Sequence, residues 1–472
     1  MPQDSLTRSA DDTGPCTVDG LRAAEFPYLD ATGQAYLDYT GAALPPLSLV
    51  RGHAERLGGG AFGNPHSASP TSMASTRLVE EARQAVLAFC GAPPDAYTVV
   101  FTPNATAAIR LVAEAFPFAA DRPLVLLGDD HNSVLGARSY AERAGARTSV
   151  VPLDADLTTR TERVTGCLDD AERSAGPGLF CYPAQSNTTG VRHPLDWVSL
   201  AHRRGWRTLL DAAAHLPTGR LDLARVPADF VALSWYKITG YPSGVGSLIA
   251  RHDALAELRR PWFAGGTVRA ATSHQNWYIP APPPEGFEDG TPPFLSLPDV
   301  TAAVRWHTRI GHDALHRHTT ALTERLLAGL ATLRHRDGTP AVRVLGPSGA
   351  ARRGPTVAFD LLRPDGTRFD ERLCQEATAA AGVSVRTGCF CNPGVAEQVN
   401  ALGPDEVRRA LARGNPADVD EYVRLLGSHA QGSVRASVGA ATDARDVDRL
   451  VDACADLLSR APADPTAPRT GC

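Results

Sequence analysis

Seven short apolar segments alternate with stretches of helical periodicity between about residues 97 and 251. Segments such as TVVF and LVLL are apolar at every position, which suits strands that are covered on both faces. Crossover helices supply that cover, so the alternation predicts an α/β fold with a mostly parallel, seven-stranded sheet. The expected strands span residues 97–103, 123–128, 148–154, 178–185, 207–213, 229–236 and 245–251, and the helices between most of them span 106–115, 133–145, 160–174 and 196–204.

The pattern changes after the proline-rich segment APPPEGFEDGTPPF at residues 281–294. Long helices follow, and then the expected strands PTVAFDLL, SVRTG and SVRASVG alternate with helices, which predicts a smaller α+β domain. With 472 residues, of which 43% are hydrophobic, the chain can form two cores of this kind. We expect flexible tails at residues 1–20 and 462–472. Between them we expect a segment at 21–50 that packs on the small domain, a large domain at 51–295, and the small domain at 296–461.

Charge and hydropathy argue against several classes of function. The net charge is -5 at pH 7 and no basic block is present, so we expect no nucleic-acid binding. The N-terminal segment lacks the apolar core of a signal peptide, and no apolar run approaches the roughly 20 residues needed to span a bilayer. We therefore expect a cytoplasmic protein that does not bind membranes.

A single lysine, Lys237, stands among 47 basic residues, all the others being arginine. Arginine can replace a solvated positive charge, but its guanidinium keeps its proton and does not form a Schiff base. If a codon bias has replaced lysine by arginine wherever only the charge matters, the one remaining lysine lies where the chemistry needs an amine. The expected strand 229–236 runs directly into Lys237 and a glycine-rich turn. Burial at that position would lower the pKa of the amine and make it nucleophilic.

Other polar residues follow expected strands, at the edge where open α/β sheets bind ligands. Asp211 ends the strand RTLLD, where a carboxylate can keep a cofactor's pyridine nitrogen protonated or can simply cap the next turn. The turn Asn104-Ala105-Thr106 joins a strand to a helix, where free N–H groups attract a phosphate. His131 follows another strand, and a loop histidine without a catalytic role is the simpler interpretation there.

Nine cysteines are scattered along the chain, a usage that favours small buried side chains over a disulfide framework. Only Cys389 and Cys391, in SVRTGCFCNPG, share a segment that resembles a site. A structural zinc ion needs further Cys or His ligands at suitable spacing, and no such pair lies nearby in the sequence, so we expect no metal. The alternative is that both cysteines are buried structural residues.

Together these motifs resemble the fold-type I pyridoxal-phosphate enzymes of the class V aminotransferase group, and within it the cysteine desulfurase domain of molybdenum cofactor sulfurases. The resemblance covers about residues 26–460 and rests on YLDYTGAAL, FGNPHS, YTVVFTPNATAA, DDHNSV, YPAQSNTTG, LDAAAH, SWYKITGYPSGVGSLIAR, FAGGT, FEDGTPPF, RTGCFCNPG and VRASVG, in the family's order. It implies that fold, a pyridoxal 5'-phosphate cofactor bound by the large domain, and a homodimer. A molybdenum cofactor sulfurase carries a further C-terminal cofactor-binding domain, which we expect this chain to lack.

The resemblance also implies a role for each candidate site residue. Lys237 would bind the cofactor as a Schiff base, Asp211 would pair with the pyridine nitrogen, and His131 would stack on the ring. The further residues that it implies are Ala105, Thr106 and Ser234 for the phosphate, Thr267 for the same phosphate from a second subunit, Asn187 and Gln185 near the ring hydroxyl and the substrate, and Arg435 for the substrate carboxylate.

Cysteine desulfurases use a loop cysteine that attacks the sulfur of the substrate, keeps it as a persulfide and releases alanine. Aligning their motif R-x-G-H-H-C on Arg386-Thr387-Gly388 places this nucleophile at Cys391, two residues after Cys389. The resemblance therefore implies a sulfurtransferase that takes sulfur from L-cysteine or a cysteine conjugate. The sulfur acceptor, a small molecule or a protein, is not identified by the sequence.

Two other hypotheses stay open. The first is another pyridoxal-phosphate enzyme of this fold, a carbon-sulfur lyase or an aminotransferase, which uses Lys237 without a persulfide on Cys391. The second is a metalloprotease, because HDALH at residues 312–316 resembles the H-E-x-x-H motif on a helix. Its acidic residue is Asp rather than Glu, and histidines four residues apart more often lie on a solvated helix face.

Overall fold

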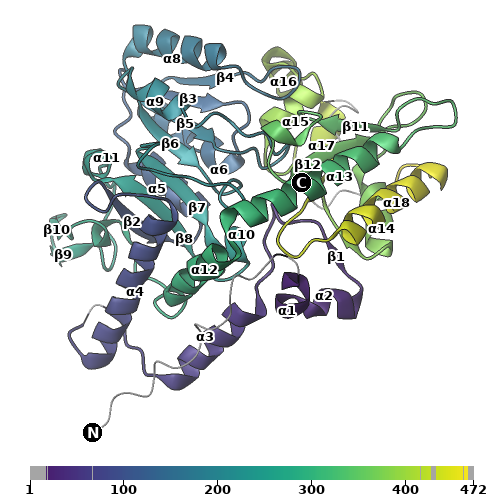
Figure 1. The fold of residues 1–472 in the computed structure, drawn as a ribbon. Coiled ribbons are helices and arrows are strands. Elements are labelled where there is room, and N and C mark those ends of the chain that lie inside the picture. The colour runs from purple at the N-terminus through teal and green to yellow at the C-terminus, as the bar shows by residue number, and fades with distance from the viewer. Residues whose placement is uncertain are drawn as a thin grey trace.

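The computed structural model describes residues 18–465 except 19, 66, 415, 427–431 and 461. The predicted tails at 1–20 and 462–472 therefore lie largely outside the described residues. Figure 1 shows the large sheet with its helices on one side of the molecule, and the C-terminal strands and helices gathered on the other. No helix in the described ranges combines the length and the apolar character that crossing a bilayer requires.

The main sheet has seven strands and confirms the predicted α/β fold. In spatial order they are β2 (Tyr97–Thr102), β8 (Gly246–Arg251), β7 (Phe230–Ser234), β6 (Arg207–Asp211), β5 (Leu179–Pro183), β3 (Leu124–Leu127) and β4 (Thr148–Val151). Strand β8 runs antiparallel to both of its neighbours, and every other pairing in the sheet is parallel. The sheet is therefore mostly parallel, as the apolar runs predict.

Successive residues of the strands enter different cores, one on each face of the sheet. In β3, Leu124 and Leu126 join one cluster of buried residues, whereas Val125 and Leu127 join the other. The first face is covered by α5 (Ala105–Ala115), α6 (Asn132–Leu135), α7 (Arg138–Arg143) and α11 (His252–Glu257). The opposite face is covered by α4 (Pro70–Phe89), α8 (Thr161–Ala175), α9 (Trp197–His202) and α12 (Leu297–Ile310). The single helix expected at 133–145 is instead the pair α6 and α7, because α6 ends at Gly136.

The C-terminal part is built on a four-stranded antiparallel sheet in the order β11 (Val342–Leu345), β12 (Thr356–Leu361), β15 (Ser433–Ser437) and β14 (Arg386–Gly388). The sequence did not predict β11, whose side chains are mostly only half-buried or exposed. The helices of this part are α13 (His312–Thr332), α14 (Glu371–Ala380), α15 (Pro393–Val399), α16 (Pro404–Leu411), α17 (Val419–Leu425) and α18 (Ala444–Arg460). Helices α13, α14 and α18 pack on this sheet around a separate core.

The N-terminal segment contacts both parts of the molecule. It contains α1 (Leu21–Glu25), α2 (Pro27–Thr32), β1 (Ala35–Tyr36) and α3 (Leu47–Gly59). Strand β1 pairs with β13 (Val383–Ser384), which splits the predicted strand SVRTG into β13 and β14 because each half pairs with a different partner. Leu21 and Phe26, however, are buried in the core of the large sheet. The segment thus joins the two parts, and the domain boundaries stay a prediction.

A hairpin and three short helices were not predicted from the sequence. Strands β9 (Val268–Ala271) and β10 (Tyr278–Pro280) form an antiparallel hairpin that stands at the edge of the large part in Figure 1. The short helices are α10 (Trp235–Thr239), η1 (Glu285–Phe287) and η2 (Ala350–Arg352). Of these, α10 matters most for function, because it follows β7 without an intervening loop and carries Lys237.

Candidate active site

A cavity of about 190 Å³ lies at the carboxyl ends of the parallel strands β5, β6 and β7. It brings together candidate residues that are far apart in the sequence. The predicted site residues that line it are Ala105, Thr106, His131, Gln185, Asn187, Asp211, Ser234 and Lys237. Open α/β sheets bind their ligands at this edge, so the cavity is the candidate active site.

Lys237 lies in the single helical turn of α10, and its neighbour Trp235 fixes that turn. The Trp235 indole is fully buried and donates a hydrogen bond to Ser247 Oγ on β8 at 3.0 Å. Among the described residues, the Lys237 amine has no hydrogen-bond or ion-pair partner. Its burial lowers the pKa of the amine below the usual 10.5, against the opposing attraction of the Asp211 carboxylate. The amine is therefore available for covalent chemistry.

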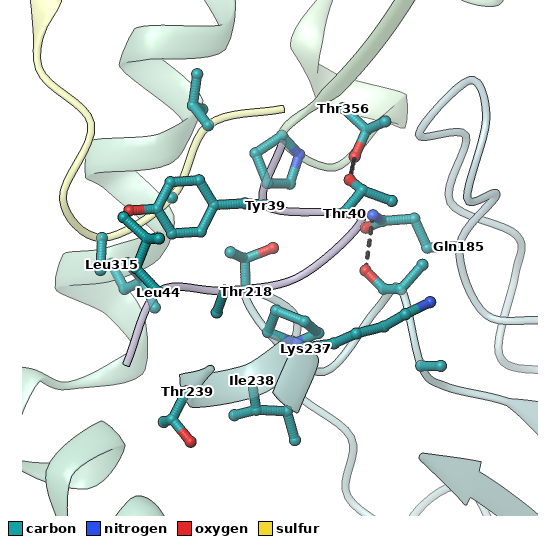
Figure 2. A pocket seen from close by; sticks show the side chains of 18 of the residues that line it. Tyr39, Thr40, Leu44, Gln185, Thr218, Lys237, Ile238, Thr239, Leu315 and Thr356 are labelled. Carbon is teal, nitrogen blue, oxygen red and sulfur yellow. Dashed lines mark hydrogen bonds between the residues drawn. The ribbon is translucent and has the colours of Figure 1, made fainter. Parts of the chain in front are cut away.

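Lys237 also borders a second, smaller pocket of about 30 Å³, which Figure 2 shows. This pocket is lined mainly by apolar side chains from several elements, including Leu44 of the N-terminal segment, Ile238 of α10 and Trp306 of α12. The two cavities share Gln185, Ala213, Ala214 and Lys237. The Gln185 side chain donates to Ala214 O at 2.9 Å, a bond drawn in Figure 2, so this wall is fixed.

One end of the cavity is the N-terminus of α5, a helix of 11 residues. Asn104 caps it by accepting the Ala107 N–H at 2.9 Å, and the Ala105 N–H donates to Ser234 Oγ at 2.8 Å. The Thr106 hydroxyl lies 2.7 Å from the Ser133 hydroxyl. A helix N-terminus with hydroxyl groups beside it suits a phosphate. Sequence reasoning missed Ser133, although it lies only two residues after His131.

His131 is held as a neutral ring. Its Nδ1 accepts the Ser133 N–H at 3.1 Å, so the other ring nitrogen carries the proton. Burial lowers the pKa of His131 from its usual 6.5, and the nearby Lys237 and Arg435 charges lower it further, although the Asp211 carboxylate opposes them. A neutral imidazole at this wall suits contact with a flat ring.

Asp211 combines the two roles that the sequence left open. One of its carboxylate oxygens accepts the Ala213 N–H at 2.9 Å, which is the turn-capping role. The side chain also lines the cavity beside Lys237. The residue can therefore hold the turn and still present its second oxygen to a bound ring nitrogen.

The loop between β14 and α15 places Cys391 beside this cavity. The Asn132 N–H, one residue after His131, donates to Cys391 O at 2.8 Å, and Asn187 Nδ2 donates to Phe390 O at 2.8 Å. Cys391 is exposed and Cys389 is partly buried, so the alternative that both are buried structural cysteines is wrong. Because Asn187 also lines the cavity, the loop is attached directly to the cavity rim.

Arg435 on β15 is buried and approaches the same loop. Its guanidinium donates to Asp38 Oδ1 at 3.0 Å and to Asn187 O at 2.9 Å, and it lies 4.9 Å from the centre of the Phe390 ring. Its Nε is buried without a hydrogen-bond partner among the described residues. Arg386 donates to the other oxygen of Asp38 at 2.7 Å. Sequence reasoning missed Asp38, which lies two residues after β1 in the motif YLDYTGAAL.

Neither Arg435 nor Thr267 lines the cavity in this single chain. The Thr267 hydroxyl donates to Ala264 O at 2.8 Å and accepts the Ala264 N–H at the same distance, within its own loop. The predicted contact of Thr267 with a phosphate therefore concerns a second subunit and stays a prediction.

The histidines of the HDALH segment lie at the start of α13, as a helical motif requires. Burial lowers the pKa of His312 to about 4. In the part of the chain that the structure describes, no group of three or more His, Cys, Asp or Glu side chains could hold a metal ion. The metalloprotease hypothesis thus has no structural observation in its favour.

Comparison with known proteins agrees with this geometry. The profile of the aminotransferase class-V family matches residues 35–450. The molybdenum cofactor sulfurase of Bos taurus is 35% identical over 90% of the chain, and that of Arabidopsis thaliana is 33% identical over 93%. The chain spans 50% and 58% of the lengths of these two relatives.

Solved structures show the same fold. The apo cysteine desulfurase of Thermococcus onnurineus NA1 has a TM-score of 0.76 at 22% identity, with 94% of this chain and 99% of that chain covered. The cysteine desulfurase CsdA of Escherichia coli has a TM-score of 0.74 at 20% identity, with the same coverage of 94% and 99%. Since the family profile spans most of the sequence and the fold agrees with it, the chain belongs to the class V aminotransferase family and is homologous to the molybdenum cofactor sulfurases.

Proposed function

We propose that this chain is a pyridoxal 5'-phosphate-dependent cysteine desulfurase, which takes sulfur from L-cysteine or a cysteine conjugate as a persulfide on Cys391 and releases alanine. The observation that carries the proposal is the attachment of the exposed Cys391 to the rim of the cavity that contains Lys237, through Asn132 and Asn187. A desulfurase needs this combination of an amine inside a cavity and a thiol at its edge.

The residues present fit the proposed cofactor. The buried amine of Lys237 suits its aldehyde, Asp211 its ring nitrogen, the neutral His131 its ring, and the N-terminus of α5 its phosphate. A structural neighbour, a C-DES mutant with a TM-score of 0.69 at 19% identity, has glycine covalently linked to its PLP cofactor. When bound, pyridoxal phosphate supplies an electron sink that weakens the bonds at the substrate Cα.

The chain's own residues then divide the work. Because its pKa is lowered, the Lys237 amine can take the proton from the substrate Cα and return it. Within the described part of the chain, the Nε of the buried Arg435 has no hydrogen-bond partner, so a substrate carboxylate would satisfy this donor. The Cys391 thiolate attacks the substrate sulfur, so that a sulfur–sulfur bond forms while the carbon–sulfur bond breaks. The electron pair of the broken bond stays with the carbon skeleton, which takes up a proton and leaves as alanine.

We also propose a homodimer in which Thr267 contributes to the site of the partner subunit. Four large apolar side chains lie exposed on the segment from Trp262 to Leu295, which contains Thr267 and the β9–β10 hairpin: Trp262, Trp277, Ile279 and Leu295. Large exposed apolar side chains that share one segment favour a protein contact. A sedimentation mass twice the chain mass of 50.0 kDa supports the dimer, and a fully active species of about 50.0 kDa excludes it.

Product analysis tests the proposed reaction. The purified protein is incubated with cysteine and a thiol reductant. Alanine with sulfide is the expected result. Pyruvate with ammonia and sulfide would instead show β-elimination, the alternative that needs Lys237 but not Cys391.

A further inference from the structure

Asn392, the residue after Cys391, anchors the cysteine loop through a fully buried side chain. Its Nδ2 donates to Asp129 Oδ1 at 2.9 Å and to the Asp129 main-chain oxygen at 3.1 Å, and it lies 3.1 Å from Asn187 Oδ1. Its Oδ1 accepts the Val395 N–H at 3.3 Å and so caps α15. The side-chain nitrogen of Asn392 therefore ties the cysteine loop, the segment between β14 and α15, to the large domain. Its side-chain oxygen ties the same loop to α15.

Asp129 is held rigidly by the large domain. Its carboxylate also accepts from Ser186 Oγ at 2.7 Å and from His193 Nε2 at 2.9 Å, and it has no exposed surface. The His193 ring in turn stacks on Trp197 at 5.6 Å. Asp129 belongs to the turn that carries His131, a wall of the cavity. The anchor point of the loop is thus a fixed part of the active-site wall.

The loop itself has a backbone that needs such an anchor. Phe390 and Cys391 have φ values of 56° and 54°, the left-handed region that residues other than glycine rarely adopt. Next to them, a Cβ on Gly394 would lie 2.0 Å from Gly128 O, so only glycine allows this close approach. Two consecutive strained residues persist only where surrounding contacts fix them, and the buried Asn392 side chain supplies such contacts.

We propose that Asn392, acting through Asp129, is a positioning residue that holds Cys391 at reacting distance from the substrate sulfur. This proposal rests on the proposed function, because it assumes that Cys391 is the sulfur acceptor. Misplacing a reacting group by about 1 Å can cost about 100-fold in rate, so the fixed loop contributes directly to sulfur transfer. Asn392 does not itself line the cavity; it acts through the loop and through its contact with Asn187, which does line it.

Two substitutions separate the two contacts of Asn392. Asn392→Asp keeps an oxygen to cap α15 but turns a negative charge toward Asp129, whereas Asn392→Ala removes both contacts. We expect either variant to lower kcat for alanine formation about 10- to 100-fold, with the KM for cysteine within about twofold. Asn400→Ala is the matched control, because Asn400 lies at the other end of α15, and it should keep both constants within about twofold of wild type.

A second readout does not depend on activity. The Asn132 N–H donates to Cys391 O, so its hydrogen exchange reports whether the loop is attached. Both Asn392 variants should speed exchange in the peptide around Asn132, and iodoacetamide should alkylate Cys391 at a changed rate. Asn400→Ala should change neither. Unchanged exchange and alkylation in folded Asn392 variants would overturn the anchor.

Exchanging the two partners provides a rescue. In the double variant Asp129→Asn, Asn392→Asp, the new amide at 129 can donate to the new carboxylate at 392 while its oxygen still accepts from His193. We expect kcat to recover at least fivefold relative to Asn392→Asp. If the double variant is no better than Asn392→Asp, the specific pairing is wrong.

Cys391→Ala, assayed in parallel, distinguishes the two proposals. If Cys391→Ala makes alanine at the wild-type rate, the proposed function fails. If Cys391→Ala is inactive while the Asn392 variants lose the loop contact and keep wild-type kcat, only the positioning proposal fails.

Discussion

The Asp38 carboxylate accepts a hydrogen bond from Arg435 at 3.0 Å, and this contact ties the N-terminal segment to the buried arginine of β15. The second Asp38 oxygen accepts from Arg386, whose strand β14 leads into the Cys391 loop. One carboxylate therefore orients the arginine proposed for the substrate carboxylate and the strand that carries the proposed nucleophile. A buried arginine is costly unless such a partner is present.

Removing the Asp38 charge should therefore weaken substrate binding more than it slows chemistry. We expect Asp38→Asn to raise the KM for cysteine about tenfold, because Arg435 loses its charged partner and its fixed orientation. Steady-state kinetics with cysteine check this. Asp30→Asn is a suitable control, since Asp30 pairs with Arg22 at the surface and should leave the KM unchanged. An unaltered KM in Asp38→Asn would contradict the role given to Arg435.

Lys237 should be the only covalent attachment point of the cofactor. Lys237→Arg keeps the charge but cannot form a Schiff base, so the visible absorption of the purified protein should be lost. Borohydride reduction of the wild type followed by peptide mass analysis should place the cofactor mass on the peptide that contains Lys237. The assignment fails if Lys237→Arg retains the wild-type absorption band.

Buried His215 should make the fold sensitive to acid. Burial lowers its pKa from 6.5 to about 4, and its Nε2 donates to Arg220 O at 3.2 Å. Because the unfolded state takes up the proton at a higher pH than the folded state, the stability due to the neutral ring is lost as pH falls from 6.5 to about 4. This loss amounts to at most about 3 kcal/mol in the free energy of unfolding.

Urea titrations at several pH values measure that loss. His215→Gln places an amide nitrogen near the position of Nε2 but does not titrate. Its free energy of unfolding should therefore fall less steeply than that of the wild type below pH 6.5. If the free energy of unfolding falls equally with pH in the two proteins, His215 is not the group that causes the loss of stability in acid.

Sequence reasoning succeeded where the signal was local. Each strand of the main sheet is a short apolar run, and most of the cavity residues follow such a run directly, as Lys237 follows β7. It failed where the hydrogen-bond partner of a residue is distant in the sequence. Asp129 and Asn392 are 263 residues apart, and nothing in DDHNSV or CFCNPG alone indicates that they bond. Strand β11 was missed for a different reason, because its mostly half-buried and exposed side chains form no apolar run.

The product yield of Cys391→Ala with cysteine as substrate decides whether Cys391 accepts the sulfur. We expect this variant to bind the cofactor as the wild type does but to lose most alanine production, because no thiolate is left to accept the sulfur. Cys389→Ala should lose less, and intact-mass analysis of the wild type after reaction without reductant should show one added sulfur atom. Wild-type alanine production by Cys391→Ala, or pyruvate as the sole organic product of the wild type, would contradict the persulfide mechanism.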